Sequence, residues 1–269
     1  MNTKIVRYIL CRMLGVEAAL LLVPVLVAVI YQEKCGIVFL IPIVILCLLF
    51  WVAGRKRPEH GQIYGKEGMV IVALAWILWS LFGAMPFTLS GYIPSYVDAF
   101  FETVSGFTTT GSSIIPDVEV LPHCLLFWRS FTHWIGGMGV LVFVLVVTSL
   151  DRKNSMHLMR AEVPGPEKDK LVPKAMSTAR ILYGMYLILT VIEMVFLVIG
   201  GMNLFDSMIF SFGSAGTGGF SNYADSVAHF NSAYIDGVIT VFCALFGVNF
   251  ALFYFMILGD FKSILKNEE

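Results

Sequence analysis

The sequence predicts an all-α polytopic membrane protein with about six transmembrane helices and two re-entrant half-helices, arranged in tandem repeats. Of its 269 residues, 58% are hydrophobic and 14% are charged, whereas about 25% of residues in a soluble domain are charged. Apolar runs of about 18–25 residues recur, the length that crosses a hydrocarbon core of roughly 30 Å. The chain also repeats itself. An Asp, a short apolar segment and a Gly/Ser/Thr loop occur twice, 108 residues apart, as Thr109 and Thr217 show.

Six apolar runs are long enough to be full crossings. Pro24 and Pro42 fall inside the first two runs, where neighbouring helices can satisfy the backbone groups that proline leaves free. The first run follows Lys4, Arg7 and Arg12, as in a signal peptide, but it is long and has no small-residue cleavage site, so we expect an uncleaved helix. The six runs cover approximately residues 13–31, 36–53, 69–89, 121–150, 181–200 and 234–258.

The distribution of lysine and arginine predicts the orientation of the chain in the membrane. No Lys or Arg occurs in residues 91–123 or 201–237, which hold the two loops. Because cytoplasmic segments carry the excess of basic residues, we expect both chain termini in the cytoplasm and both loops on the outer side. Basic residues follow the second run (Arg55, Lys56, Arg57, Lys66), the fourth (Arg152, Lys153, Arg160, Lys168, Lys170, Lys174) and the sixth (Lys262, Lys266).

Two apolar segments, residues 95–107 and 204–213, are too short to cross a membrane. As helices they rise only about 15–20 Å, so we expect them to be re-entrant. Interrupted hydrophobic segments at matching positions of two repeats are typical of a transport site. We therefore expect an N-terminal transmembrane hairpin over residues 1–65, a first helix–loop–helix repeat with a cytoplasmic connector over 66–174, and a second repeat over 175–269.

The two loops have the composition of an ion-selectivity filter. A cation in a membrane exchanges its water for fixed oxygens, which the carbonyls of an extended Thr/Gly segment can supply, and glycine permits the positive φ that this needs. Each half-helix would add the partly negative dipole of its C-terminal end. Either loop alone could be an ordinary flexible loop, and residues 216–219 lack the Lys-Ser/Thr ending of a phosphate loop. The duplication favours the filter. An acidic outer mouth is expected from Asp98, Glu102, Asp117, Glu119, Asp206 and Asp225.

Four motifs resemble those of one family. They are similar to the TrkH branch of the Trk/Ktr/HKT potassium transporters, and the similarity covers nearly the whole chain. The resemblance implies four helix–pore loop–helix repeats around one pore, preceded by an extra hairpin, with K+ as the transported ion and no covalently bound cofactor. The motifs are FFETVSGFTTTG (100–111), WRSFTHWIGGMG (128–139), VPGP (163–166) and GGFS (218–221).

In this family each repeat contributes one filter glycine. The resemblance implies that Gly111 favours potassium, since relatives with serine there tend to pass sodium. It also implies a place in the cell inner membrane, a homodimer in the lipid bilayer and a cytoplasmic nucleotide-binding regulatory subunit. Because the chain holds two repeats where the family has four, it resembles an N-terminal half, and a missing C-terminal half or a second pore subunit would complete the pore. The implied K+-binding residues are Thr109, Thr110, Gly111, Thr217, Gly218 and Gly219.

Arg129 and Glu193 are charged residues within the fourth and fifth crossings. By helical rise both lie roughly 10–12 Å below the outer surface, where an unpaired charge costs at least about 2.5 kcal/mol. We therefore expect a structural ion pair between them. A direct role in permeation is one alternative; another is that Arg129 binds loop carbonyls around Thr110 while Glu193 meets a different donor. Gly136, Gly137 and Gly139 are expected to be close-packing positions rather than ligand sites.

Three classes of function can be compared. A potassium-translocating subunit, or half of one, is the leading hypothesis, and a non-conducting truncated fragment or assembly subunit is the alternative. An intramembrane enzyme would need a His-Glu-x-x-His motif or paired intramembrane aspartates, which are absent from the sequence, so we assign no catalytic residue. The five scattered cysteines predict neither disulfides nor a metal site. We expect no nucleic-acid partner.

Overall fold

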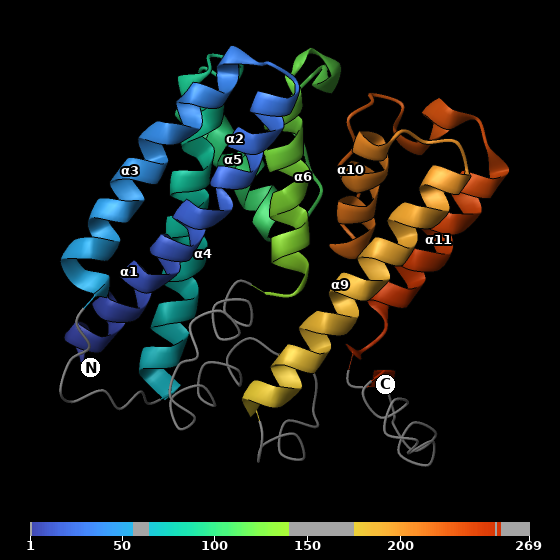
Figure 1. Ribbon diagram of the computed structural model, residues 1–269. Coiled ribbons are helices and arrows are strands. Elements are labelled where there is room, and N and C mark those ends of the chain that lie inside the picture. Colours follow the sequence, from blue (N-terminus) through green and yellow to red (C-terminus); the bar gives the residue numbers. More distant parts are fainter. Residues whose placement is uncertain (1, 56–64, 140–174, 251, 254–269) are drawn as a thin grey trace.

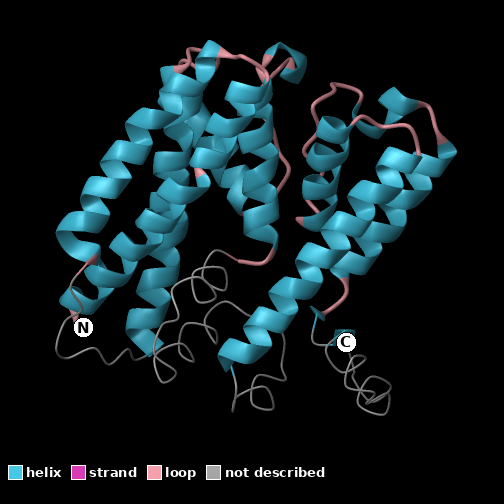
Figure 2. Ribbon diagram, in the orientation of Figure 1, coloured by secondary structure: helices cyan, strands magenta, loops and turns pink. Residues whose placement is uncertain are grey.

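The computed structural model describes residues 2–55, 65–139, 175–250 and 252–253. This part consists of helices and loops without a strand (Figure 2), so the expected all-α class is confirmed. Four of its helices are long and apolar enough to cross a membrane: Thr3–Ile30, Lys34–Gly54, Lys66–Leu89 and Ile181–Ile199. The other two expected crossings are described in part, as α6 (His123–Gly137) and α11 (Ala233–Gly247). The connector 151–174 with its VPGP motif lies outside the described residues.

The N-terminal hairpin is the blue part of Figure 1. Its first arm is α1 (Thr3–Leu20) and α2 (Leu22–Ile30), and its second arm is η1 (Lys34–Phe39), α3 (Leu40–Leu49) and the π-helical turn η2 (Phe50–Gly54). The first arm is interrupted at Leu21, just before Pro24, which has no N–H to continue the helical hydrogen bonds. Small residues let the arms approach, because a Cβ at Gly15 would lie 2.7 Å from the Phe50 ring of the second arm, and one at Gly54 would lie 3.2 Å from the Cys11 backbone of the first arm.

The first repeat consists of α4 (Gly65–Leu89), the half-helix α5 (Tyr96–Phe107), the short turn η3 (Val118–Val120) and α6. Aromatic side chains fill the space between its helices. The Trp128 indole N–H donates to the Gly83 carbonyl over 2.9 Å, and the Phe107 ring meets Trp79 and Trp128 edge-on. The buried indole thus has the partner that it needs in an apolar core.

The second repeat consists of α9 (Ala175–Ile199), the half-helix α10 (Leu204–Ala215), the turn η5 (Ser226–Phe230) and α11. Figure 1 shows α10 beside α6, near the junction of the two repeats. The half-helices α5 and α10 have 12 residues each, and their first and last residues correspond at the 108-residue offset. Their N-caps correspond too: Ser95 accepts from Asp98 N–H and Asn203 from Asp206 N–H.

A residue at the tip of the N-terminal hairpin, far from α6 in the sequence, caps the N-terminus of α6. The N-cap of α6 is Pro122, which has no side chain able to cap. The Glu33 carboxylate accepts instead from the backbone N–H of His123 and Cys124 over 2.7 and 3.0 Å, and from the His123 ring over 2.9 Å. Tyr31 stacks on the same His123 ring with centroids 4.0 Å apart. A carboxylate at a helix N-terminus satisfies two orphan donors and matches the helix dipole.

We expect Glu33→Gln to lower thermal stability at neutral pH by about 1 kcal/mol, the usual contribution of a helix cap. Burial acts to raise the pKa of Glu33, but the hydrogen bonds from Cys124 and His123 outweigh it, so its pKa is lowered from 4.5. A lowered carboxyl pKa stabilises the fold above the unfolded pKa, and this contribution is lost as pH falls through the folded pKa. The difference between wild type and variant, measured by thermal unfolding in detergent, should therefore shrink in acid.

Asp225→Asn is the matched control, because Asp225 pairs with His229 over 3.5 Å but its side chain is 57% exposed. We expect little change in stability from it at any pH, as for other exposed pairs. Equal effects of the two substitutions would contradict the capping role of Glu33.

Candidate functional site

The segments after the two half-helices have the same backbone conformation. Thr109 and Thr217 have φ of 54° and 53°, and Gly111 and Gly219 have φ of 78° and 79°. The residues between them do not have positive φ. The hydrogen bonds that close each half-helix also correspond: Thr109 N–H to Gly106 O (3.0 Å) with Thr217 N–H to Ser214 O (2.9 Å), and Thr110 N–H to Ser105 O (2.9 Å) with Gly218 N–H to Gly213 O (3.1 Å).

The backbone is strained at Thr109 and Thr217. A β-branched residue with positive φ is a genuine outlier, and the left-handed conformation costs about 1–2 kcal/mol per residue. Such strain persists where the surrounding structure imposes it, and it is concentrated at functional sites. Alternating signs of φ can also direct successive carbonyls to one side of a segment, as a ring of backbone ligands requires.

The two loops are in contact through their glycines. A Cβ on Gly111 would overlap the carbonyl oxygen of Gly218 and would lie 2.9 Å from its carbonyl carbon. A Cβ on Gly219 would meet none of the described residues within 4 Å. The loops are therefore non-helical and adjacent, with a packed side at Gly111 and, among the described residues, an open side at Gly219.

Helix α6 lies between the C-terminal ends of both half-helices. A Cβ on Gly136 would overlap the carbonyl oxygen of Phe107, the last residue of α5, and one on Gly137 would lie 2.9 Å from the carbonyl oxygen of Ala215, the last residue of α10. The expected close packing of both glycines is thus confirmed. The partly negative ends of two helix dipoles meet beside the loops, an arrangement that favours a cation.

The expected ion pair between Arg129 and Glu193 is wrong. Arg129 donates from Nε to the Glu102 carboxylate over 2.6 Å, and from Nη1 to the Ser221 carbonyl in the second loop over 2.9 Å. The Arg129 guanidinium also lies 3.6 Å from the centroid of the Phe220 ring. Glu102 accepts three further bonds, from the Ser113 hydroxyl to both of its oxygens and from Ile114 N–H.

The Glu193 carboxyl lies beside Ser214 of α10 and Cys243 of α11. The side chain is fully buried, and neither of its oxygens makes a hydrogen bond of ordinary geometry with a described residue. Equal depth in the membrane was thus a poor guide to pairing, because depth does not fix the direction in which a side chain leaves its helix.

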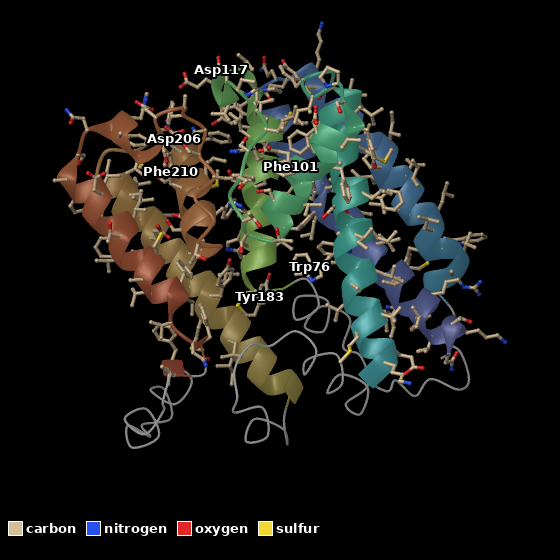
Figure 3. All side chains as sticks on the ribbon, turned by 180° about the vertical axis from the view of Figure 1, so that it is seen from behind. Trp76, Phe101, Asp117, Tyr183, Asp206 and Phe210 are labelled. Atoms are coloured by element: carbon tan, nitrogen blue, oxygen red, sulfur yellow. The ribbon has the colours of Figure 1, made fainter. Side chains whose placement is uncertain are left out.

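The outer mouth is less acidic than expected. Glu102 and Asp206 are buried, whereas Asp117, Glu119 and Asp225 are exposed. Asp206 accepts hydrogen bonds from the side chains of Asn203, Asn222 and Tyr223, so it anchors the chain that follows the second loop. Figure 3 shows Asp206 and Asp117 near the upper end of the molecule, with Phe210 lower on α10.

Sequence reasoning missed the roles of Glu102 and Phe220. The buried face of α5 includes Ala99, Glu102, Thr103 and Gly106, which are spaced as one face of a helix. This spacing was a usable signal that Glu102 points inward. Phe220 stacks on the His133 ring with centroids 3.9 Å apart, and no pattern in the sequence indicates this contact.

Comparisons with known proteins agree with this architecture. The chain is 36% identical over 245 residues to the Trk system potassium uptake protein TrkH of Escherichia coli (strain K12), covering 89% of this chain and 50% of that protein. It is 35% identical over 263 residues to the Trk system potassium uptake protein TrkG of the same organism, covering 96% and 54%. The crystal structure of the potassium transporter TrkH from Vibrio parahaemolyticus matches with a TM-score of 0.80 and 30% identity, covering 94% of this chain and 52% of that one.

The chain spans about half the length of the curated relatives it matches. The model of the family described as "TrkH: Cation transport protein" matches residues 36–267, which include both half-helices and both loops. On this match and on the sequence identities to its relatives, the chain belongs to the TrkH family of cation transport proteins.

Proposed function

We propose that this chain supplies two of the four loops of a potassium-selective filter in a membrane uptake protein. The observation that carries the proposal is the pair of adjacent loops, with positive φ at Thr109 and Gly111 and at the equivalent Thr217 and Gly219. The ligands for K+ are the backbone carbonyls of Thr109, Thr110, Gly111, Thr217, Gly218 and Gly219. Stacked carbonyls replace the hydration shell of the ion, and the exposed carboxylates at the outer end raise the local cation concentration.

The rest of the pore comes from outside this chain in the proposal. The open side of Gly219 is where a further loop would pack, as Gly218 packs on Gly111. That loop belongs to a C-terminal half or to a second pore subunit. A homodimer in the bilayer and a cytoplasmic nucleotide-binding regulatory subunit complete the assembly, with both termini in the cytoplasm and the protein in the cell inner membrane. In this proposal the chain is divided into three domains: the N-terminal hairpin 1–65 and the repeats 66–174 and 175–269.

The test is Rb+ tracer uptake by bacteria that lack their own potassium uptake systems. One strain expresses this chain, another the C-terminal half of the Vibrio parahaemolyticus TrkH protein, and a third both halves. Uptake by the third strain alone supports the proposal with a C-terminal half as partner, and uptake by the first strain supports it with a second copy as partner.

The alternative is a non-conducting fragment or assembly subunit. Membrane-inserted protein without uptake in any strain, although the two halves co-purify, would favour that alternative. A matched positive control is the full-length Vibrio parahaemolyticus protein, divided at the equivalent position and expressed as two chains.

A further inference from the structure

One buried ion pair holds equivalent positions of both loops. Ser113 and Ser221 correspond at the 108-residue offset, each lying two residues after its filter glycine. Glu102 accepts from the Ser113 hydroxyl over 3.0 Å, and Arg129 donates to the Ser221 carbonyl over 2.9 Å. Glu102 and Arg129 are joined over 2.6 Å, with side chains 0% and 3% exposed. A continuous chain of polar contacts therefore connects the outer end of one loop to that of the other.

Arg129 also fixes the second loop through an aromatic ring. The Phe220 ring contacts the Arg129 guanidinium at 3.6 Å from its centroid, and it also stacks on the His133 ring. A Cβ on Gly218 would lie 2.5–2.6 Å from atoms of His133, so this side chain also supports the loop directly. A planar guanidinium can bind a carboxylate, a carbonyl and a ring face together, which a lysine ammonium cannot do equally well.

The second repeat has no such pair at the equivalent positions. At the 108-residue offset, Phe210 corresponds to Glu102 and Gly237 corresponds to Arg129. The chain after the second loop is instead held to its own half-helix by Asp206, through Asn222 and Tyr223. The pair in the first repeat therefore serves both loops. Burying two charges in a membrane protein is unfavourable unless they are paired, and here Glu102 and Arg129 pair with each other.

We propose that Glu102 and Arg129 are positioning residues that hold the two filter loops in register and thereby set ion selectivity. The pair acts on the loops through the Ser113 hydroxyl, the Ile114 N–H and the Ser221 carbonyl. The consequence for selectivity rests on the proposed function, whereas the mechanical coupling of the two loops does not.

Hydrogen–deuterium exchange of the purified chain in detergent tests the coupling. In Arg129→Lys, which keeps the charge, we expect exchange in residues 216–223 to accelerate about tenfold, the factor expected when one hydrogen bond to a charged group is lost. Exchange in α1 should stay unchanged. Ser113→Ala removes only one hydroxyl at an exposed position and should accelerate exchange in residues 110–115 while the fold stays intact.

Arg12→Gln is the control, because Arg12 also donates a hydrogen bond and lies over an aromatic ring, but in the hairpin: its partner for both contacts is Tyr8, whose hydroxyl accepts over 3.0 Å. It should leave both loops unchanged. Unchanged loop exchange in Arg129→Lys and Ser113→Ala, or equal acceleration in every helix, would overturn the proposal.

If the chain shows no uptake in any strain while the loop-specific exchange is found, the coupling stands and the proposed function fails. In a conducting assembly, Arg129→Lys should also lower the K+/Na+ uptake ratio at normal membrane abundance, and an unchanged ratio would reject the role in selectivity.

Discussion

Under the proposed function, replacing Gly111 by serine is expected to lower sharply the K+ over Na+ selectivity of uptake by the assembly that contains this chain. Gly111 has φ of 78°, and a Cβ there would overlap the carbonyl oxygen of Gly218 in the adjacent loop. The backbone strain alone costs about 1–2 kcal/mol, and the overlap with another backbone cannot be relieved by a rotamer change. Since about 1.4 kcal/mol corresponds to a tenfold change, we expect the K+/Na+ uptake ratio to fall at least about tenfold.

Substitutions at two other glycines distinguish the effect of backbone strain from the effect of steric overlap. Gly219 has the same positive φ, but its Cβ would meet none of the described residues within 4 Å, so Gly219→Ser tests strain without a clash inside this chain. Gly237 lies in α11 without positive φ and with open space around its Cβ, so Gly237→Ser tests the added side chain alone. The loss of tracer uptake should be largest for Gly111→Ser, smaller for Gly219→Ser and smallest for Gly237→Ser. An unchanged K+/Na+ ratio in Gly111→Ser at normal abundance would contradict the filter assignment.

The half-helices and the loops could be predicted from the sequence because the chain contains two copies of them. A segment of about 12 residues between full crossings is too short to cross the membrane. The 108-residue offset aligns the equivalent glycines of the two copies in the sequence. The positive φ of Gly111 and Gly219 is one that glycine adopts without steric cost. The positive φ of Thr109 and Thr217 does not follow from residue type, since threonine disfavours this region, and it arises from the hydrogen bonds that close each half-helix.

The partner of Arg129 could not be predicted from depth in the membrane. Depth fixes one coordinate of a side chain, and the direction in which it leaves the helix fixes which helix it meets. Arg129 points to α5 and the second loop, whereas Glu193 points between α10 and α11. The cap of α6 by Glu33 joins residues 90 positions apart in the chain, so no local pattern could have indicated it.

A double-mutant cycle between Arg129 and Glu102 is expected to show strong coupling. Removing one partner of a buried ion pair costs about 3–5 kcal/mol, because it leaves the other charge without compensation. Arg129→Gln and Glu102→Gln should each lower the free energy of unfolding by this amount, while the double variant should lose much less than the sum. The measurement is unfolding of the purified chain in mixed detergent micelles, followed by circular dichroism.

The matched cycle pairs Arg129→Gln with Glu193→Gln, and it should be close to additive because the two side chains share no contact. Glu193→Gln alone should be nearly neutral or stabilising, because a buried carboxyl that makes no hydrogen bond of ordinary geometry with a described residue is replaced by an amide of the same size. Strong coupling of Arg129 to Glu193, with additive effects at Glu102, would restore the pairing expected from depth alone. It would also remove the link through which Arg129 joins the two loops.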